Sequence, residues 1–191
     1  FRSRWFLVLF LSPATLTSTD ESIAQAACIL RNEGIVAFPT ETVYGLGARF
    51  DSVKAIERVF AAKGRPDDNP LIVHISHPAE LSVIATGVTA LAERLILAFW
   101  PGPLTIVLPK TPVVPKIATG GLETVGVRMP AHAMALALIA TVGVPLVAPS
   151  ANLSGRPSPT SALHVNEDLA GRIDAILDGG ITEVGLESTV I

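Results

Sequence analysis

Apolar residues recur along the chain with two different spacings, and segments of the two kinds alternate. Spacings of three and four residues predict amphipathic helices, whereas short unbroken apolar runs predict buried strands. The predicted helices cover about 20–33, 53–62, 88–99, 130–141 and 161–170, with a short one from Pro78. The predicted strands cover 35–38, 71–75, 104–108, 125–129, 144–148 and 173–177, and another begins at 187. This alternation favours an α/β protein.

Each predicted helix has an apolar face that is expected to pack inward. Thr19 or Asp20 can cap the first helix, and Gly34 can end it. The expected inward positions include Val53, Ile56, Val59 and Phe60 in the second helix and Leu91, Leu95 and Phe99 in the helix over 88–99. Residues 39–47, which are rich in hydroxyl groups and glycine, are predicted to form a loop.

The order of the elements does not follow strict strand–helix–strand units. Prolines and glycines interrupt residues 109–122, so two apolar strands are joined there without a helix. Such a connection is typical of antiparallel neighbours, and it predicts a mixed sheet rather than a purely parallel one. With 191 residues, the chain is long enough for one domain with a sizeable core.

Composition narrows the functional classes. Hydrophobic residues make up 49% of the chain and charged residues 16%, yet no apolar run approaches the roughly 20 residues that cross a bilayer. The net charge of −3 excludes a general basic field for nucleic acid, so any anion site must be local. The single cysteine, Cys28, excludes an internal disulfide and is expected to be a small buried residue.

Residues 1–19 are interpreted as an N-terminal extension or a first strand. Arg2 and Arg4 precede the apolar run 5–11, and this pattern is also found in short secretory signals. The run 6–11 could equally be a buried strand. Residues 20–191 are assigned to one domain, and the chain starts with Phe rather than Met.

Polar residues follow several of the predicted strands at the point where each strand ends. They are Thr40, Thr42, His74, Arg128, Ser150, Asn152 and Ser188. Ligands of open α/β sheets gather near strand ends, so these side chains are expected to share one site. Their mixture of a cation, hydroxyl groups and an amide suits an anionic, polar ligand such as a nucleotide or an amino acid.

Two cations follow the second predicted helix in the segment Lys63-Gly64-Arg65. In an extended segment, residues two apart point to the same side. Arginine offers a planar fork of donors and lysine a compact charge, and together they suit a polyphosphate. The segment therefore predicts a phosphate-binding loop.

Each of these features also has an ordinary structural interpretation. His74 can be a buried core histidine, and Arg128 can be an ion-pair partner. The segments 63–65 and 149–152 can be a solvated loop and a simple turn. Glu41 can be a cap, or an acceptor that supports the ligand-contacting residues.

Several common active-site motifs are absent from the sequence. It contains no Walker A segment, no HExxH, no GxSxG elbow and no dinucleotide fingerprint. No metal ligands are assigned, because no His/Cys ligand spacing appears and few carboxylates cluster. Any Mg²⁺ is expected to be held mainly by the phosphates of a nucleotide.

Seven segments, in order along residues 20–191, resemble the YrdC-like threonylcarbamoyl-AMP synthases. They are 38–47 (FPTETVYGLG), 63–66 (KGRP), 69–71 (NPL), 100–105 (WPGPLT), 127–130 (VRMP), 149–155 (PSANLSG) and 187–190 (ESTV). The resemblance implies an α/β fold in which a twisted mixed sheet, flanked by helices, surrounds a deep, positively lined cavity. It also implies a cytoplasmic enzyme that has no membrane association.

The implied reaction joins L-threonine, bicarbonate or CO₂, and ATP into threonylcarbamoyl-adenylate with release of pyrophosphate. Downstream transferase proteins would use this product to modify certain tRNAs, so tRNA itself is an indirect or weak partner. The residues implied to bind threonine are Thr42 or Thr40, His74, Arg128, Ser188 and the backbone at Ala148. Those implied to bind ATP are Lys63, Arg65, Asn69, Thr124, Ser150, Asn152 and Ser158, with Lys63, Arg65, Ser150 and Asn152 as the catalytic signature.

Two other hypotheses remain open at this point. A carbamoyl-adenylate-forming relative, as in hydrogenase maturation proteins, would not depend on threonine. A non-catalytic RNA-binding module would bind RNA with a steep salt dependence, and the net charge of −3 argues against it. Members of the resembling family continue beyond the Glu-Ser-Thr-Val segment, so the domain is expected to be truncated at its C-terminus.

Overall fold

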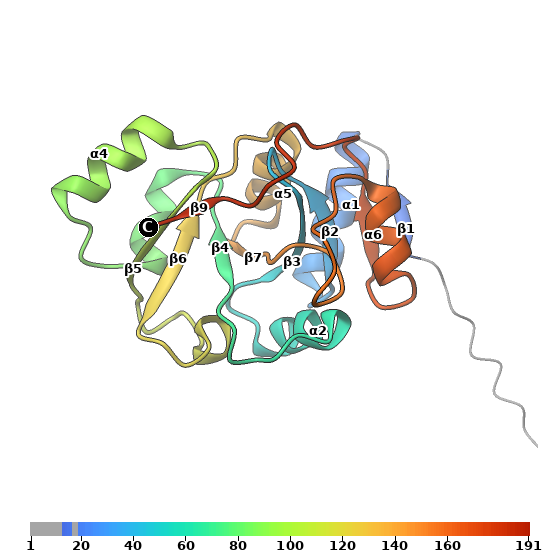
Figure 1. Ribbon diagram of the computed structural model, residues 1–191, viewed down its shortest axis with the longest axis horizontal. Coiled ribbons are helices and arrows are strands. Elements are labelled where there is room, and N and C mark those ends of the chain that lie inside the picture. Colours follow the sequence, from blue (N-terminus) through green and yellow to red (C-terminus); the bar gives the residue numbers. More distant parts are fainter. Residues whose placement is uncertain (1–12, 17–18) are drawn as a thin grey trace, which may run out of the picture.

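The structure is a computed structural model that describes residues 13–16 and 19–191, and it contains one sheet with helices on both faces (Figure 1). Within these residues the sheet has nine strands in the order β1-β8-β2-β3-β7-β4-β6-β5-β9. The strands are β1 (Ala14–Leu16), β2 (Val36–Pro39), β3 (Tyr44–Arg49), β4 (Ile72–His74), β5 (Leu104–Pro109), β6 (Thr124–Arg128), β7 (Leu146–Val147), β8 (Ala175–Leu177) and β9 (Thr189–Val190). The helices are α1 (Asp20–Arg31), α2 (Val53–Lys63), α3 (Leu81–Ile84), α4 (Ala90–Phe99), α5 (Ala133–Val142) and α6 (Ala162–Leu169), with 3₁₀ turns η1 (Pro78–Glu80) and η2 (Lys116–Thr119).

The sheet contains both parallel and antiparallel neighbours, which confirms the predicted mixed sheet. The parallel pairs are β1/β8, β2/β8, β4/β6 and β5/β9. The antiparallel pairs are β2/β3, β3/β7, β4/β7 and β5/β6. The Pro-rich connection over 110–123 joins β5 to its antiparallel neighbour β6, as the sequence predicts.

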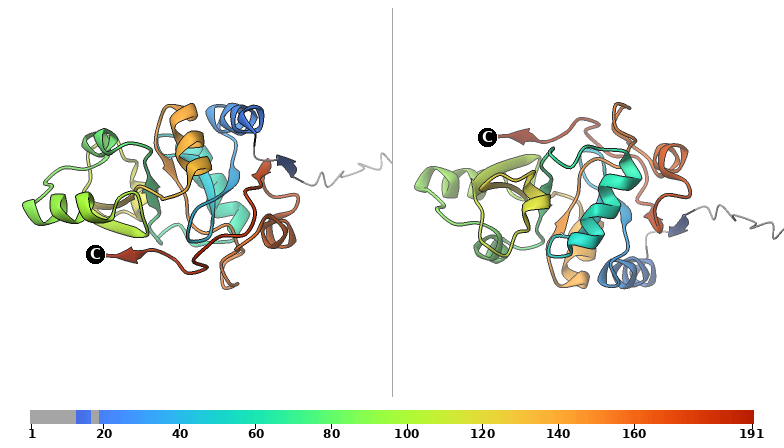
Figure 2. Two further views of the ribbon diagram at one scale, coloured as in Figure 1. Left: turned by 90° about the horizontal axis from the view of Figure 1, so that it is seen from above. Right: turned by 90° about the horizontal axis from the view of Figure 1, so that it is seen from below.

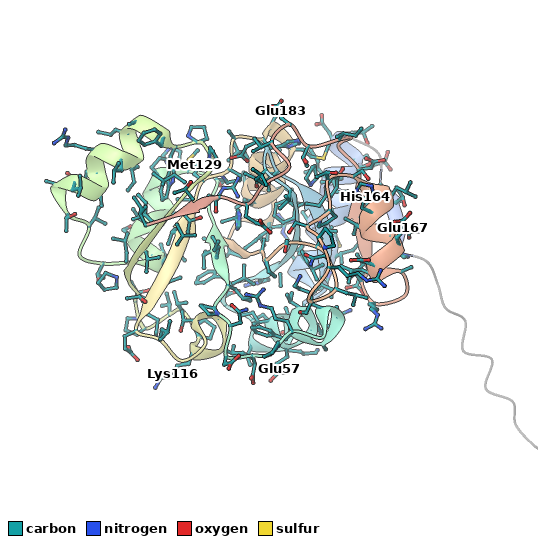
Figure 3. The ribbon with its side chains drawn as sticks, in the orientation of Figure 1. Glu57, Lys116, Met129, His164, Glu167 and Glu183 are labelled. Atoms are coloured by element: carbon teal, nitrogen blue, oxygen red, sulfur yellow. The ribbon has the colours of Figure 1, made fainter. Side chains whose placement is uncertain are left out.

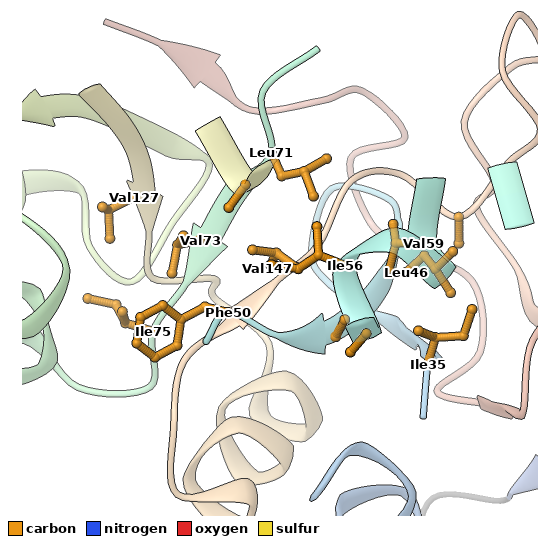
Figure 4. Packing of buried hydrophobic residues seen from close by; sticks show 14 of the residues in the cluster. Ile35, Leu46, Phe50, Ile56, Val59, Leu71, Val73, Ile75, Val127 and Val147 are labelled. Carbon is orange, nitrogen blue, oxygen red and sulfur yellow. The ribbon is translucent and has the colours of Figure 1, made fainter. Parts of the chain in front are cut away.

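Alternate residues of the central strands point to opposite faces and separate two apolar clusters. On β8, Ala175 and Leu177 pack in the cluster formed with α1 and α5, whereas Ile176 packs in the larger cluster on the other face. Figure 2 shows α1 and α5 together on one side of the sheet. In the larger cluster, Ile56 and Val59 of α2 pack among strand residues that include Leu46 and Val147 (Figure 4). The two apolar clusters occupy the faces of the sheet, so the ends of the strands can carry a binding site.

Local capping explains where helices α1 and α2 begin. Thr19 caps α1 by accepting a hydrogen bond from the backbone of Ser22 at 3.2 Å, as predicted. Ser52 caps α2 in the same way through the backbone of Ala55. At the other end of α2, Gly64 has a left-handed conformation with φ of 60°, which ends the helix after Lys63.

Four expectations about packing and local structure are wrong in whole or in part. Helix α4 packs inward only in part, since Leu95 packs against the larger cluster as expected but Leu91 is 64% exposed and Phe99 55% exposed. Val53 is also exposed, since it lies in the first turn of α2, before the face that packs inward. Cys28 is exposed rather than buried. Residues 44–47 belong to strand β3 instead of a loop, because their backbone pairs with β2.

Charged residues that have no part in the core lie at the periphery. Glu57 on α2 and Lys116 on η2 project from the lower edge of the view in Figure 3.

Of the N-terminal predictions, the apolar run 6–11 and the signal pattern lie outside the described residues. Strand β1 pairs with β8 in parallel. Among the described residues, no helix is long and apolar enough to span a bilayer.

Candidate functional site

A cavity of about 70 Å³ lies where strands β4 and β6 end. It is lined by Thr40, Thr42, Val43, Gly45, Ile72, His74, Arg128, Ala148, Pro149, Ser150, Glu187 and Ser188. Strands β4 and β6 are parallel with His74 opposite Arg128, so the register of the sheet brings these two side chains to the same end. Seven residues predicted from strand ends and from the resemblance therefore meet in one cavity: Thr40, Thr42, His74, Arg128, Ala148, Ser150 and Ser188.

Arg128 is the buried cation of this cavity, with 4% of its surface exposed. Its Nε donates to the carbonyl of Gly102 at 3.2 Å, and its Nη1 donates to Oγ1 of Thr42 at 3.0 Å. Its Nη2 lies 2.7 Å from a carboxylate oxygen of Glu41. A guanidinium has five N–H bonds, so one N–H on each terminal nitrogen remains for a ligand. This arrangement suits two-point binding of a carboxylate.

The contact between Arg128 and Glu41 is a buried ion pair, because both side chains are about 95% buried. The two atoms are close, but the contact does not have the angles of a hydrogen bond, and neither carboxylate oxygen of Glu41 has a hydrogen-bond partner. Isolated charges are costly to bury, so each of these groups compensates the other. Of the two interpretations of Glu41, the structure favours the supporting acceptor.

The two threonines of the loop between β2 and β3 have different partners. The Thr40 hydroxyl donates to the carbonyl of Val43 at 2.7 Å and accepts from the backbone N–H groups of Thr42 and Val43. Thr40 is therefore occupied in shaping its own loop. The Thr42 hydroxyl contacts Thr40 at 2.8 Å and accepts from Arg128, so it joins the loop to the cation. Thr42 is consequently the better placed of the two for a ligand.

His74 is buried at the end of β4 and is neutral. Its Nδ1 lies 3.3 Å from the carbonyl oxygen of Ile72, which can only accept, so Nδ1 carries the proton. Nε2 is then an acceptor, and no described residue bonds to it. Burial, reinforced by the positive charge of Arg128, lowers the pKa of His74 to about 3. The site thus offers a neutral imidazole acceptor throughout the physiological pH range.

Lys63 lies behind the cavity and holds the loop that follows β7. Its Nζ donates to the carbonyl of Ser150, to the carbonyl of Asn152 at 2.7 Å and weakly to the Asn152 side chain at 3.4 Å. The side chain is almost fully buried. Burial, with a smaller contribution from Arg65, lowers the pKa of Lys63 to about 8. The two signature segments of the sequence are therefore joined in space.

The amide of Asn152 is used within its own loop. Its Nδ2 donates to the carbonyls of Leu153 at 2.9 Å and Arg156 at 2.8 Å, so the side chain fixes the turn that follows Ser150. Asp168 on α6 supports the same turn, because it accepts from the backbone of Leu153. The turn interpretation of this segment is confirmed, and the same turn positions Ser150 at the cavity.

The C-terminal segment runs from β8 to β9 (Figure 1), and its Glu187 and Ser188 line the cavity. Two backbone hydrogen bonds, from Val184 to Glu41 and from Gly185 to Thr42, attach it to the β2–β3 loop. Glu187 accepts a hydrogen bond from Ser158, and Ser188 contacts the hydroxyl of Thr105 at 2.7 Å. The segment brings a carboxylate and a hydroxyl group to the cavity that Arg128 also lines.

A model of the Sua5/YciO/YrdC family, described as telomere recombination, matches residues 28–191. The chain belongs to this family. The threonylcarbamoyl-AMP synthase of Pyrococcus abyssi is 59% identical over 166 residues, which cover 87% of this chain and 49% of the relative. That of Bacillus subtilis is 52% identical over 190 residues, which cover 98% of this chain and 54% of the relative. The chain thus spans about half the length of these two relatives.

A solved structure of a family member supports the same conclusion. The crystal structure of P. abyssi Sua5 complexed with L-threonine matches with a TM-score of 0.91 and 55% identity, covering 93% of this chain and 53% of that one. The twisted mixed sheet flanked by helices is therefore the fold of this family, as the resemblance implied.

Of the seven residues of this Sua5/YciO/YrdC domain that were predicted to bind ATP, only Ser150 lines the cavity; the other six are Lys63, Arg65, Asn69, Thr124, Asn152 and Ser158. Thr124 begins β6, the strand that ends at Arg128, so it lies at the opposite end of that strand. Asn69 is exposed in the loop before β4. Arg65 donates to the carbonyl of Pro70 at 3.3 Å, and burial lowers its pKa.

The expectation that Lys63 and Arg65 point to the same side is wrong. Lys63 is the last residue of α2 rather than part of an extended segment, and Gly64 turns the chain in a left-handed conformation after it. Lys63 is directed inward to Asn152, whereas Arg65 lines a surface groove with Glu57. The two cations therefore act from different positions.

Two acidic residues of the site were not assigned a ligand-binding role from the sequence. Glu187 lines the cavity, and Glu41 contacts Arg128. Both residues lie inside segments that resemble the family. Each is next to a residue that was assigned to the site, and this position in the sequence could have indicated their role. Within the described residues, no group of three or more His, Cys, Asp or Glu side chains could hold a metal ion.

Proposed function

We propose that this domain binds L-threonine, bicarbonate or CO₂, and ATP, and that it forms threonylcarbamoyl-adenylate and pyrophosphate. The gathering of Thr42, His74, Arg128 and Ser188 around one cavity carries the proposal. These are the residues for which the family resemblance implies threonine binding. The names of the two relatives and the L-threonine complex of P. abyssi Sua5 support it.

The carboxylate of threonine is proposed to bind Arg128. The guanidinium has one free N–H on each terminal nitrogen, because its other contacts go to Gly102, Thr42 and Glu41. Nε2 of His74 can accept a hydrogen bond from the amine or the hydroxyl group of the ligand. A neutral imidazole places no second positive charge near the amine, which must lose its proton before it reacts.

The reaction requires no nucleophile from the protein. The neutral amine of threonine attacks the carbon of CO₂, which bicarbonate supplies by losing water after protonation; the N–C bond forms as a C=O electron pair moves onto oxygen, and the amine proton passes to water, leaving a carbamate. A carbamate oxygen then attacks the α-phosphorus of ATP, the bond to the bridging oxygen breaks, and pyrophosphate leaves. The domain contributes positioning and charge, which account for most of the rate in such phosphoryl-group chemistry.

ATP is proposed to bind along the surface from Ser150 toward the loop after α2. Lys63 keeps the Ser150–Asn152 turn in place and brings a positive charge close to it. Ser158 and Asn152 are proposed to support this surface, with Arg65, Asn69 and Thr124 binding more distant parts of the nucleotide. A positively lined, deeper cavity remains a prediction for the ligand-bound protein.

A Mg²⁺ ion is proposed to be held mainly by the phosphate oxygens of ATP. The donor set fits this arrangement, since the described residues offer scattered carboxylates such as Glu187 rather than a protein cage. When bound, the ion would neutralise charge on the phosphates. The product is proposed to be passed to transferase proteins that modify tRNA, with tRNA as an indirect partner.

The proposal is tested by following pyrophosphate release with ATP, Mg²⁺ and bicarbonate, in the presence and absence of L-threonine. Release that requires both threonine and bicarbonate is the expected result, and L-serine should support much less. Pyrophosphate release that does not depend on threonine would favour a carbamoyl-adenylate-forming enzyme instead. Absence of both ATP and threonine binding in calorimetry would overturn the proposal.

A further inference from the structure

We propose that Glu41 is the positioning residue that aims Arg128 at the carboxylate of the amino-acid substrate. This inference rests on the proposed function and assigns a role to a residue that does not line the cavity. Glu41 is 95% buried, and its Oε1 lies 2.7 Å from Nη2 of Arg128. Among the described residues, Glu41 is the acid paired with this guanidinium.

The guanidinium of Arg128 is fixed from three directions. Gly102 accepts from Nε and Thr42 accepts from Nη1, and both acceptors are neutral. Glu41 supplies the charged contact, at Nη2. Of these three partners only Glu41 carries a full opposite charge, and the attraction between opposite charges is strong where both are buried, so Glu41 makes the largest electrostatic contribution to holding the plane of the fork. With that plane fixed, the two free N–H bonds remain directed away from the three partners.

Glu41 is itself held by the segments that border the cavity. It lies between Thr40 and Thr42 in the loop that joins β2 to β3, and its backbone carbonyl accepts from the N–H of Val184 in the C-terminal segment. One residue thus links the loop, the cation on β6 and the C-terminal segment. A change at Glu41 is therefore transmitted to the carboxylate-binding end of the site.

The unsatisfied carboxylate oxygens support this assignment. Neither oxygen of Glu41 has a hydrogen-bond partner, and Nη2 of Arg128 also lacks one with proper angles. Buried polar groups are normally hydrogen-bonded, and exceptions gather where function requires them. A carboxylate retained here without partners is explained if its charge orients the guanidinium. A neutral residue of similar size would suffice if it only filled space.

The matched variants are Glu41→Gln, which keeps the shape and removes the charge, and Glu41→Ala, which removes the contact. Glu93→Gln on the exposed surface of α4 is the control. Binding of L-threonine and of L-threoninamide, which lacks the carboxylate, is measured by calorimetry. Threoninamide reports every contact except those made to the carboxylate.

We expect the Kd of L-threonine to rise roughly 10-fold in Glu41→Gln and up to roughly 100-fold in Glu41→Ala, because small misplacements of a binding group cost this much. The Kd values of threoninamide and ATP should change less than about threefold. Glu93→Gln should match the unchanged protein for all three ligands. If Glu41→Ala fails to fold, Glu41→Gln alone decides.

Three results would overturn the inference. L-threonine binding that is unchanged in Glu41→Gln would show that the charge does not position Arg128. Tighter binding would show that Glu41 mainly repels the incoming carboxylate. An equal loss for threonine and threoninamide would indicate a general structural role. If the unchanged protein does not bind L-threonine at all, the proposed function fails together with the inference.

Discussion

Nζ of Lys63 lies 2.7 Å from the carbonyl oxygen of Asn152, 89 residues away in the chain. The contact ties the end of α2 to the turn that follows β7, and the same ammonium also bonds to the carbonyl of Ser150. The two signature segments of the sequence therefore form one structural unit. Lys63 supports the shape of the turn as well as the charge of the site.

Replacing Lys63 by Met should reduce pyrophosphate release by roughly 10²- to 10³-fold, the usual effect of removing one electrostatic stabiliser. The backbone carbonyls of Ser150 and Asn152 would lose their buried donor, which costs about 1–3 kcal/mol of unfolding free energy per unsatisfied group. Turnover and urea denaturation measure the two effects. Lys116→Met on the exposed turn η2 is the control. Near-normal turnover in Lys63→Met would contradict the assignment.

ATP binding should weaken as the pH rises above about 8. The pKa of Lys63 is lowered to about 8, so the ligand-free protein holds this proton below that pH and loses it above. ATP is an anion and favours the charged form, so its Kd should be steady near pH 7 and then rise by up to about tenfold per pH unit. Calorimetry from pH 6.5 to 9.5 measures this, and Lys63→Met should lack the rise. A flat profile in the unchanged protein would count against a charged Lys63 at the site.

The same pKa has a consequence for stability, with a defined sign. Unfolding returns Lys63 to its ordinary pKa of 10.5, so the unfolded chain binds more protons between about pH 8 and 10.5. The contribution of this group to stability therefore increases with pH across that window, and its cost is fully present below pH 8. The stability difference between the unchanged protein and Lys63→Met should shift in favour of the unchanged protein as pH rises. An opposite shift in urea titrations would contradict the burial of a protonated lysine.

Arg128→Lys keeps the positive charge but removes the planar fork. We expect the KM for L-threonine to rise at least about tenfold while the KM for ATP changes less than about twofold, because a point charge cannot bind a carboxylate at two points. Arg128→Ala would also leave Glu41 buried without a partner, at a cost of about 3–5 kcal/mol in unfolding free energy. Steady-state kinetics separates the substrates. A change confined to ATP would show that Arg128 does not bind threonine.

The exposed face of α4 should tolerate polar substitutions. Leu97 is 84% exposed, so Leu97→Ser should change the unfolding free energy by no more than about 0.5 kcal/mol. Ile56 is fully buried in the larger cluster, and Ile56→Ala should cost about 2–5 kcal/mol. Urea denaturation of the two variants gives the comparison. A loss of several kcal/mol in Leu97→Ser would mean that Leu97 is covered in the folded protein, contrary to its exposure in the structure.

Strands β2, β7 and β8 could be predicted from the sequence because their apolar runs are fully buried. His74 and Arg128 could each be recognised as a polar residue at the end of an apolar run, whereas their pairing became known only from the register of the sheet. Helix starts were equally accessible, since Thr19 and Ser52 use their own side chains as caps. These features depend on residues close together in the chain, or on burial alone.

The remaining features depend on contacts between distant parts of the chain, which the spacing of apolar and polar residues does not reveal. The apolar pattern of α4 indicates a helix, but not which face the rest of the chain covers. The backbone conformation of Gly64 separates Lys63 from Arg65, and an extended segment was the wrong assumption there. The ion pair between Glu41 and Arg128 joins β6 to the β2–β3 loop, and only the fold brings them together.

The central claim is that this domain joins threonine, a one-carbon unit and AMP. We would supply ¹³C-bicarbonate, L-threonine and ATP and examine the products by mass spectrometry. The account predicts an adenylate that contains threonine and one ¹³C atom, formed in equal amount to pyrophosphate and lost in Lys63→Met. An adenylate without ¹³C, or AMP and pyrophosphate with no threonine-containing product, would contradict it.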